Sequence, residues 1–323
     1  MNKAPFFITV LCVAVVTSII SAVSAEEPAG PASAPTKPPG KSEASADAGS
    51  PAATQQNKSL TEINKEMNNP VSDLWYLTVQ YNHIWSEGKL ADGTKDADIM
   101  VFQPVLPLKL TKEWNLINRP TASFVLGEAA PSGFLDEDGT TKLDFDHVGG
   151  MGDTVILSLL APSAARSFLW GFGPILTLPT ASDKRLGAGK WSAGPAGFLG
   201  YIGDRGFIGL LAQQQWSYAG WADEHVSLTD LQYFVQLFLP GEWQVGLGNP
   251  DVLIDWTVDD DDKVTFPVGL NVAKMIKVGE TPVKLWLSGY YTPVRPDSFG
   301  EEWAVRFQIS PTIPSLIKGY LFE

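Results

Sequence analysis

The stretch LWYLTVQYNHIWS, residues 74–86, alternates between two kinds of side chain. Every second residue from Trp75 belongs to a mostly apolar set that begins and ends with tryptophan, whereas the residues between them are mostly polar. A period of two predicts a strand with two different faces. Trp75 to Trp85 covers ten rises of about 3.3 Å, which a tilt near 40° shortens to roughly 25 Å, the height of the apolar band of an outer-membrane barrel. A soluble sandwich also buries an apolar face, but it has no need of tryptophan at both rims.

The same pattern recurs about twelve times. It covers residues 75–85, 99–109, 114–126, 154–161, 168–178, 191–202, 207–218, 226–239, 243–257, 264–272, 283–291 and 302–310. Within 243–257 the apolar parity changes between Leu247 and Val252, and a bulge at Asn249-Pro250 would absorb the extra residue. These segments predict an all-β fold, an antiparallel transmembrane β-barrel of about 12 strands within residues 71–323.

The connections alternate in length, as they do in outer-membrane barrels. The turns at 111–113, 203–205 and 240–241 are short, whereas the connections at 128–144 and 179–190 are long. A soluble sandwich has no reason for this alternation. It predicts an outer-membrane protein of a Gram-negative bacterium with both termini in the periplasm.

The N-terminal segment, residues 1–25, has the features of a secretory signal peptide. Lys3 precedes an apolar run from Phe6 to Ile20, and Val23-Ser24-Ala25 is a small-residue cleavage site. An uncleaved anchor helix is the alternative, but the run is short for a bilayer. Because Cys12 is the only cysteine, the mature chain is expected to have neither a disulfide nor a Cys-ligated metal.

Residues 26–58 are rich in Ala, Pro, Ser and Gly and predict a disordered spacer. A short helix is expected over 59–70, because Ser59 to Glu62 fits a capping box and Asn69-Pro70 ends the helix. Leu60, Ile63 and Met67 would share one face of it. We hypothesise that these three residues form a plug that packs into or beneath the lumen.

The inward faces of the strands are expected to line the lumen, and the candidates mix amides, charges and aromatic rings. They are Gln80, Asn82, Arg119, Gln213, Gln215, Asp230, Gln232, Lys284, Trp286, Tyr290 and Arg306. Phe234 and Phe238 also fall on inward faces. One interpretation is a lining that guides a solute, and the other is a polar filling that closes a narrow bore. The aromatic content favours an apolar or aromatic solute over a bare ion.

The net charge of −13 argues against nucleic acid as a partner. The expected partners are outer-membrane lipid and lipopolysaccharide, the barrel assembly machinery and a small-molecule solute, and no cofactor or metal site is predicted. The acidic segments Asp136–Asp138 and Asp259–Asp262 could bind a divalent cation, but neither has the spacing of an EF-hand. Solvated loop charge is the preferred interpretation.

An outer-membrane lipid enzyme is an alternative, since a serine–histidine pair could act on lipid. The chain has three histidines, His83, His147 and His225, and no G-x-S-x-G motif, so no catalytic residue is predicted. Gly149-Gly150-Met151-Gly152-Asp153 precedes a strand instead of a helix. It is therefore expected to be a turn or a bulged strand start and not a phosphate loop.

Several segments resemble a known family. KEMNNPVSDL, GPILTLPTASDKRLGAGKWSAGP, QQQWSYAG, FPVGLNVAK, PVKLWLSGYYTPVRP and WAVRFQIS are similar to the outer-membrane proteins grouped under the phenol meta-cleavage pathway name, often called transporter or neuromedin U. The resemblance runs from about Asn57 to Ser310 and implies a Gram-negative outer-membrane barrel tied to uptake of hydrophobic or aromatic compounds. Residues 312–323 depart from the family pattern, because Phe322 is followed by Glu323 and the end of the last strand is uncertain.

Together these observations predict a passive channel for small solutes, hydrophobic or aromatic ones in particular, and not an enzyme. A structural or interaction barrel with a closed lumen remains the alternative.

Overall fold

The structure is a computed structural model that describes residues 59–69, 72, 74–137, 140–164, 167–317 and 319–322. The predicted signal peptide and spacer lie outside these residues. The described chain contains one helix, α3 (Leu60–Glu66), and 14 strands. The strands are β1 (Trp75–Glu87), β2 (Lys95–Lys109), β3 (Trp114–Glu137), β4 (Thr140–Met151), β5 (Thr154–Pro162), β6 (Phe168–Leu178), β7 (Lys190–Ile202), β8 (Gly206–Gly220), β9 (Ser227–Leu239), β10 (Trp243–Gly246), β11 (Asp251–Asp255), β12 (Val264–Val278), β13 (Thr281–Val294) and β14 (Gly300–Ile313).

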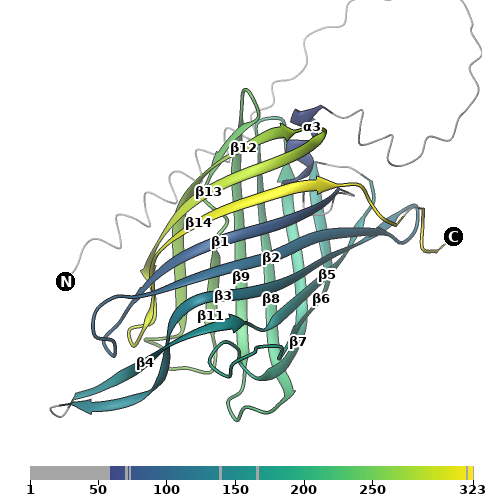
Figure 1. The fold of residues 1–323 in the computed structure, drawn as a ribbon. Helices are drawn as coiled ribbons and strands as arrows, with labels where there is room; N and C mark the ends of the chain where they lie inside the picture. The colour runs from purple at the N-terminus through teal and green to yellow at the C-terminus, as the bar shows by residue number, and fades with distance from the viewer. Residues whose placement is uncertain are drawn as a thin grey trace, which may run out of the picture.

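The strands form one closed antiparallel barrel (Figure 1). Except for β4 with β5 and β10 with β11, strands that follow each other in the chain are paired, and β1 closes the circle by pairing with β14 as well as with β2. Strands β4 and β5 share one position beside β3, and β10 and β11 share one position between β9 and β12. The barrel therefore has 12 strand positions, which confirms the predicted fold. Closure leaves no open sheet edge, as a sheet in hydrocarbon requires.

The two ends of the barrel differ. Helix α3 and the ends of β14 and β1, where Ile313 pairs with Trp75, lie at the end with short turns, which we call the helix end. The other end carries the longer connections, and we call it the long-loop end. Its largest feature is a hairpin of β3 and β4 that projects beyond the barrel (Figure 1).

This hairpin forms the long connection expected over 128–144, with two strands that the sequence did not predict. Strand β3 continues to Glu137 and pairs with β4 from Thr140 onward. The alternation of apolar and polar side chains does not predict these strands, because a ribbon outside the membrane needs no apolar face. Its backbone groups are satisfied by pairing alone.

Both interruptions of the barrel wall are one-residue bulges. From Gly246 to Asp251 the chain advances five residues while β9 advances four, from Gln236 to Gln232. The bulge predicted at Asn249-Pro250 is thereby confirmed, and the left-handed backbone at Asn249, with φ of 55°, makes the bend.

The second bulge lies between β4 and β5. Met151 faces Phe124 and Val155 faces Thr121, so four steps on one side face three on the other. This junction contains Gly152 and Asp153, and it agrees with the bulged strand start expected from the glycine-rich motif.

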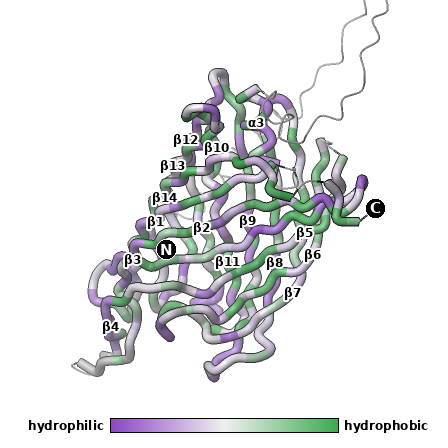
Figure 2. The backbone as a smooth tube through the Cα atoms, turned by 45° about the vertical axis from the view of Figure 1, so that its right-hand side comes forward, coloured by the Kyte–Doolittle hydropathy of each residue, from purple (hydrophilic) through white to green (hydrophobic). Residues whose placement is uncertain are grey.

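The outward face is apolar along the middle of the strands. Hydrophobic and hydrophilic residues are interspersed along the wall strands (Figure 2), and the large hydrophobic side chains that are exposed include Phe102, Leu199, Leu270 and Phe307. Such a continuous apolar surface would be a liability in water but fits hydrocarbon. The described part of the chain contains no helix long and apolar enough to cross a membrane.

The tryptophans mark the two rims. Of the 11 tryptophans, Trp75 and Trp286 are buried, and the other nine are exposed or half-buried near strand ends. Trp75, expected on the outward face, is only 6% exposed, and its indole N–H donates to the Pro107 carbonyl at 2.7 Å. Seven of these nine lie on strands, and Trp221 and Trp256 lie in connections at the long-loop end. This distribution agrees with the aromatic girdles expected from the sequence.

The last strand ends at Ile313, and the chain continues beyond it. The N–H groups of Leu321 and Phe322 donate to the carbonyls of Lys109 and Leu110 at 2.9 and 2.8 Å. The C-terminal segment therefore rests on the helix end of β2 and does not extend the barrel.

Candidate functional site

A cavity of about 140 Å³ lies inside the barrel. It extends from Met67 and Asn68, just after α3, to Arg119 in the first part of β3 and Arg306 near the middle of β14. Its walls are side chains on the inward faces of the strands, because alternate residues of a strand point to the same side. One side of the cavity is apolar and the other is polar.

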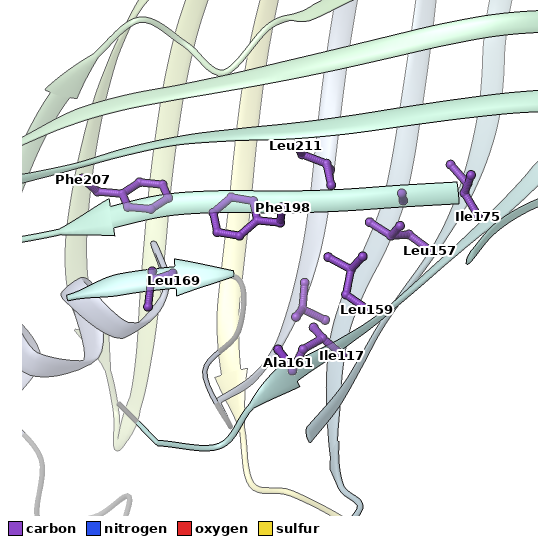
Figure 3. Packing of buried hydrophobic residues seen from close by; sticks show 11 residues of the cluster. Ile117, Leu157, Leu159, Ala161, Leu169, Ile175, Phe198, Phe207 and Leu211 are labelled. Atoms are coloured by element: carbon purple, nitrogen blue, oxygen red, sulfur yellow. The ribbon is translucent and has the colours of Figure 1, made fainter. Parts of the chain in front are cut away.

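The apolar side is a packed cluster that we call the wall cluster. It consists of Val105, Ile117, Leu157, Leu159, Ala161, Leu169, Ile175, Ala196, Phe198, Phe207 and Leu211, all buried (Figure 3). Phe234 packs against it, with ring centroids 6.0 Å from Phe198 and 5.9 Å from Phe207. A Cβ at Gly200 would lie 2.8 Å from the ring of Phe198, and one at Gly209 would lie 3.0 Å from it, so these glycines make room for the ring.

The polar side is held by hydrogen bonds, one between the neighbouring strands β1 and β14 and one across the lumen from β3 to β9. Arg306 Nε donates to Asn82 Oδ1 at 2.7 Å, and its guanidinium lies 5.1 Å from the ring centroid of Tyr290. Arg119 Nη1 donates to Gln232 Oε1 at 3.3 Å, while Arg119 Nε has no hydrogen-bond partner. Both arginines are therefore held in place, and Arg119 keeps one donor without a partner.

The bulge after β10 turns polar backbone into the lumen. The Tyr290 hydroxyl donates to the Gly248 carbonyl at 2.6 Å, and Asn271 Oδ1 accepts from the Gly248 N–H at 2.9 Å. Gln236, fully buried, donates to Asn249 Oδ1 at 3.1 Å. Gly248 and Asn249 border the cavity, so this bend is part of its wall.

The predicted lumen residues fall into two groups. Those that border the cavity are Gln80, Arg119, Gln232, Lys284, Trp286 and Arg306. Those that are buried or half-buried on the same inward faces without bordering it are Asn82, Gln213, Gln215, Asp230 and Tyr290. In the second group, Gln213 donates to Asp230 at 2.8 Å and Gln215 accepts from Thr177 at 2.5 Å. These residues fill the lumen with polar contacts.

Met67 and Asn68, at the C-terminal end of helix α3, form the floor of the cavity. Ser59 and Glu62 make the capping box that the sequence predicts, which fixes where the helix begins. Ile63 and Met67 are buried with Leu74 and Met275, a group we call the helix cluster, and Leu60 packs at its margin. The three residues of the plug hypothesis thus lie together on the inward side of the helix end.

Polar contacts also hold the helix to the barrel. Asn64 donates to the Glu242 carbonyl at 3.2 Å and accepts from Gln244 Nε2 at 2.7 Å. Lys65 forms an exposed ion pair of 2.7 Å with Asp204, in the turn before β8. That lysine holds the pKa of the Asp204 carboxyl below its usual range.

Sequence reasoning missed the wall cluster. Inward positions of β5 and β6 such as Leu157, Leu159 and Ile175 are apolar although they face away from lipid. The available signal was that residues 155–160 and 174–176 are nearly continuous apolar runs, which indicates a strand buried on both faces.

The glycine-rich motif supports a loop at the long-loop end. The Asp153 carboxylate accepts hydrogen bonds from the N–H groups of Ala181 at 3.1 Å and Ala188 at 2.8 Å. Within the same loop, Arg185 pairs with Asp183 at 2.8 Å, and its guanidinium holds the pKa of that carboxyl well below its usual range. The motif is therefore structural.

The residues of the enzyme alternative are scattered. His83 lies 2.7 Å from Asp98 on the outward face, and His147 and His225 are exposed. Among the described residues no serine hydrogen-bonds to a histidine. The described chain also holds no group of three or more His, Cys, Asp or Glu side chains suited to a metal. Of the acidic loop residues, Asp260 pairs with Lys263 and Asp262 accepts from the Ser298 N–H.

No family model and no curated protein matches the sequence. Among solved structures, an outer-membrane channel from Pseudomonas putida F1 is similar, with a TM-score of 0.56 and 14% identity over 75% of this chain and 96% of that one. This likeness establishes a shared β-barrel fold. A FadL homologue of Pseudomonas aeruginosa (TM-score 0.35, 10% identity, 77% of this chain and 93% of that one) and the toluene transporter TodX of P. putida (0.35, 13%, 76% and 91%) are too distant to support an argument.

Proposed function

We propose that this protein is an outer-membrane channel for the passive passage of small solutes with apolar or aromatic bodies. The observation that carries the proposal is the lumen cavity, because it has a packed aromatic and aliphatic side within a barrel whose outward face is equally apolar. An apolar cavity with a few placed polar groups is the usual form of a small-molecule site. The channel named in the similar structure of Pseudomonas putida F1 is consistent with this proposal.

In this proposal the helix end faces the periplasm and the long-loop end faces outward, as the lengths of the connections suggest. Lipid would contact the exposed apolar band, and the girdles would lie at the two interfaces. Contacts with lipopolysaccharide and with the barrel assembly machinery remain predictions. No catalytic role is proposed for any residue.

Helix α3 would act as a plug in the resting channel. Side-chain contacts hold the helix segment against the barrel. Ile63 and Met67 pack in the helix cluster, Asn64 accepts a hydrogen bond from Gln244, and Lys65 forms an ion pair with Asp204. No strand pairing holds this segment, so it can leave without opening the barrel.

The test is a liposome-swelling panel of sugars, amino acids, benzyl alcohol and benzoate, run on the mature protein and on a variant lacking residues 59–69. We expect the ring-containing solutes to pass faster than sugars of similar size, and the deletion to raise passage of all solutes severalfold. Heat-modifiable migration on gels checks that the deletion variant is a folded barrel. If both proteins are impermeable to every solute, the lumen is closed and the barrel is structural.

A further inference from the structure

Three cations border the cavity. Arg119, Lys284 and Arg306 line it, and its described lining residues include no carboxylate. Within the described chain none of the three forms an ion pair; their hydrogen-bond acceptors are amide and carbonyl oxygens. A buried cation without a counter-charge costs free energy, so a site of this kind favours an anionic ligand.

The three cations are not equivalent. Asp230 and Asp251 act electrostatically on Arg119, and Asp251 and Glu301 act on Arg306, all from nearer the long-loop end. No described acid acts on Lys284 in this way. A negative charge beside Lys284 would therefore meet less repulsion from carboxylates than one beside Arg119 or Arg306.

Lys284 is also the most enclosed of the three, with 4% of its surface exposed. Its ammonium donates to Asn68 Oδ1 at 2.8 Å and lies 5.1 Å from the ring centroid of Trp286. Asn68 belongs to the segment that follows α3, and its own amide nitrogen donates to the Asn64 carbonyl at 2.7 Å. A neutral amide oxygen is thus placed where a carboxylate oxygen would make the stronger, charge-assisted hydrogen bond.

The size of the cavity sets the size of the ligand. An apolar cavity of about 150 Å³ in another protein holds benzene, and this one has a similar volume of about 140 Å³. Phe198 and Phe207 border the same cavity as Lys284. A ligand with one ring could therefore place the ring on the wall cluster while its charged group reaches toward the floor.

We propose that Lys284 and Trp286 bind the carboxylate of a small ring-containing acid, with its ring against the wall cluster. The carboxylate replaces Asn68 Oδ1 as the hydrogen-bond acceptor of the Lys284 ammonium. Binding of the acid therefore breaks one of the contacts that hold the segment after α3 against the barrel. This inference rests on the proposed channel function and names its substrate class as apolar monocarboxylates.

The first test compares 4-fluorobenzoate with 4-fluorobenzamide, which has the same ring and no charge. Fluorine NMR titration of the full mature protein in detergent at pH 7 gives the two dissociation constants, since the benzoate is ionised there. We expect the acid to bind more tightly, on the order of tenfold to a hundredfold, as one charged hydrogen bond provides. Equal binding of the two compounds would overturn the proposal.

The matched variants are Lys284→Gln and Lys190→Gln. Lys190 is also a buried lysine, 8% exposed, on an inward face, but it does not border the cavity. We expect Lys284→Gln to abolish the preference for the acid and Lys190→Gln to keep it. Lys284→Arg should retain the preference, which guards against a misfolded glutamine variant. Loss of the preference in Lys190→Gln alone would contradict the site.

Variants of Asn68 test the exchange of partners. Asn68→Ala leaves Lys284 without its amide partner and should tighten binding of the acid severalfold. Asn68→Asp gives Lys284 a permanent carboxylate and should weaken binding of the acid at least tenfold, with little change for the amide. An unchanged dissociation constant for the acid in Asn68→Asp would show that the carboxylate binds elsewhere.

Passage and binding are measured separately, so the two proposals can fail separately. If the acid binds at Lys284 but no solute crosses liposomes, even without residues 59–69, the site stands and the channel fails. If solutes cross without any preference for the acid in binding, the channel stands and the site fails.

Discussion

The helix end of the lumen is filled in two different ways. On one side, the wall cluster consists of side chains that belong to the barrel strands themselves. On the other side, Ile63, Met67 and Leu74 of the segment that precedes β1 pack with Met275 of β12. The wall cluster cannot leave without unfolding the barrel, whereas the helix segment is held by side-chain contacts and by no strand pairing. If the helix is the plug that we propose, the same end of the lumen combines a permanent surface with one that can be removed.

The energetic difference follows from continuity. Removing a side chain of the wall cluster should lower the free energy of unfolding of the whole barrel, because the sheet is one cooperative unit. Loss of a helix contact should first shift the equilibrium between the docked and undocked helix. Such local openings have lower free energies than unfolding of the whole barrel. Three substitutions can sharpen or break this comparison.

The largest effect is expected for Phe198→Ala. Phe198 is 1% exposed in the centre of the wall cluster, and deleting a buried Phe usually costs about 3–5 kcal/mol in the free energy of unfolding. Urea unfolding in lipid vesicles measures it. Phe307→Ala is the matched control, because Phe307 faces outward, 42% exposed, and lipid can fill the space it leaves. Equal losses in the two variants would contradict a packed wall cluster.

An intermediate effect is expected for Ile63→Ala. Ile63 is 4% exposed, and truncating a buried Ile usually costs about 2–5 kcal/mol. Here the cost should appear as faster hydrogen exchange of residues 60–68 and higher solute leakage, with barrel unfolding unchanged. Leu60→Ala, at the margin of the same cluster, should give a smaller increase in hydrogen exchange and in solute leakage. If Ile63→Ala lowers barrel stability as much as Phe198→Ala does, the helix is not a separate unit.

The smallest effect is expected for Lys65→Gln, which removes the exposed ion pair with Asp204. Such pairs contribute about 0–1 kcal/mol, here to docking of the helix. The pKa of the Asp204 carboxyl is lowered by Lys65, so the contribution is fully present above the ordinary Asp pKa and is lost as the pH falls through the lowered value.

Docking measured by hydrogen exchange should accordingly be independent of pH between about 5 and 8 and should weaken only in stronger acid. Lys277→Gln is the control, because Lys277 forms a similar pair of 2.9 Å with Glu280 at the same end, and this pair includes no residue of α3. A pH dependence of docking near neutrality would point to a different group.

Much of the barrel could be predicted from the sequence, because lipid outside and a lumen inside impose opposite demands on alternate residues. The strands β1, β13 and β14 show this most clearly, with Val79 and Phe307 outward and Gln80 and Arg306 inward. The parity change around Asn249 even located the bulge.

The wall cluster could not be predicted, because the expected alternation of apolar outward and polar inward residues assumes a polar lumen. In β5 the inward Leu157 and Leu159 are as apolar as the outward Ile156 and Leu160, so the alternation vanishes where the wall cluster begins. The β3–β4 hairpin was missed for the opposite reason, since it lies beyond the lipid and has no apolar face to detect. The position of Asn68 beneath Lys284 depends on how a separate segment docks, which periodicity does not encode.

The distribution of tryptophan has a spectroscopic consequence. Nine of the 11 indoles are exposed or half-buried, and in the proposed membrane position quenchers attached to lipid chains can reach those on the outward strand faces, whereas Trp75 and Trp286 are buried. In bilayers containing brominated lipid, the emission that survives should be enriched in these two. With Trp75 replaced by phenylalanine, the surviving emission would come chiefly from the one indole beside the Lys284 ammonium, a native optical reporter inside the lumen.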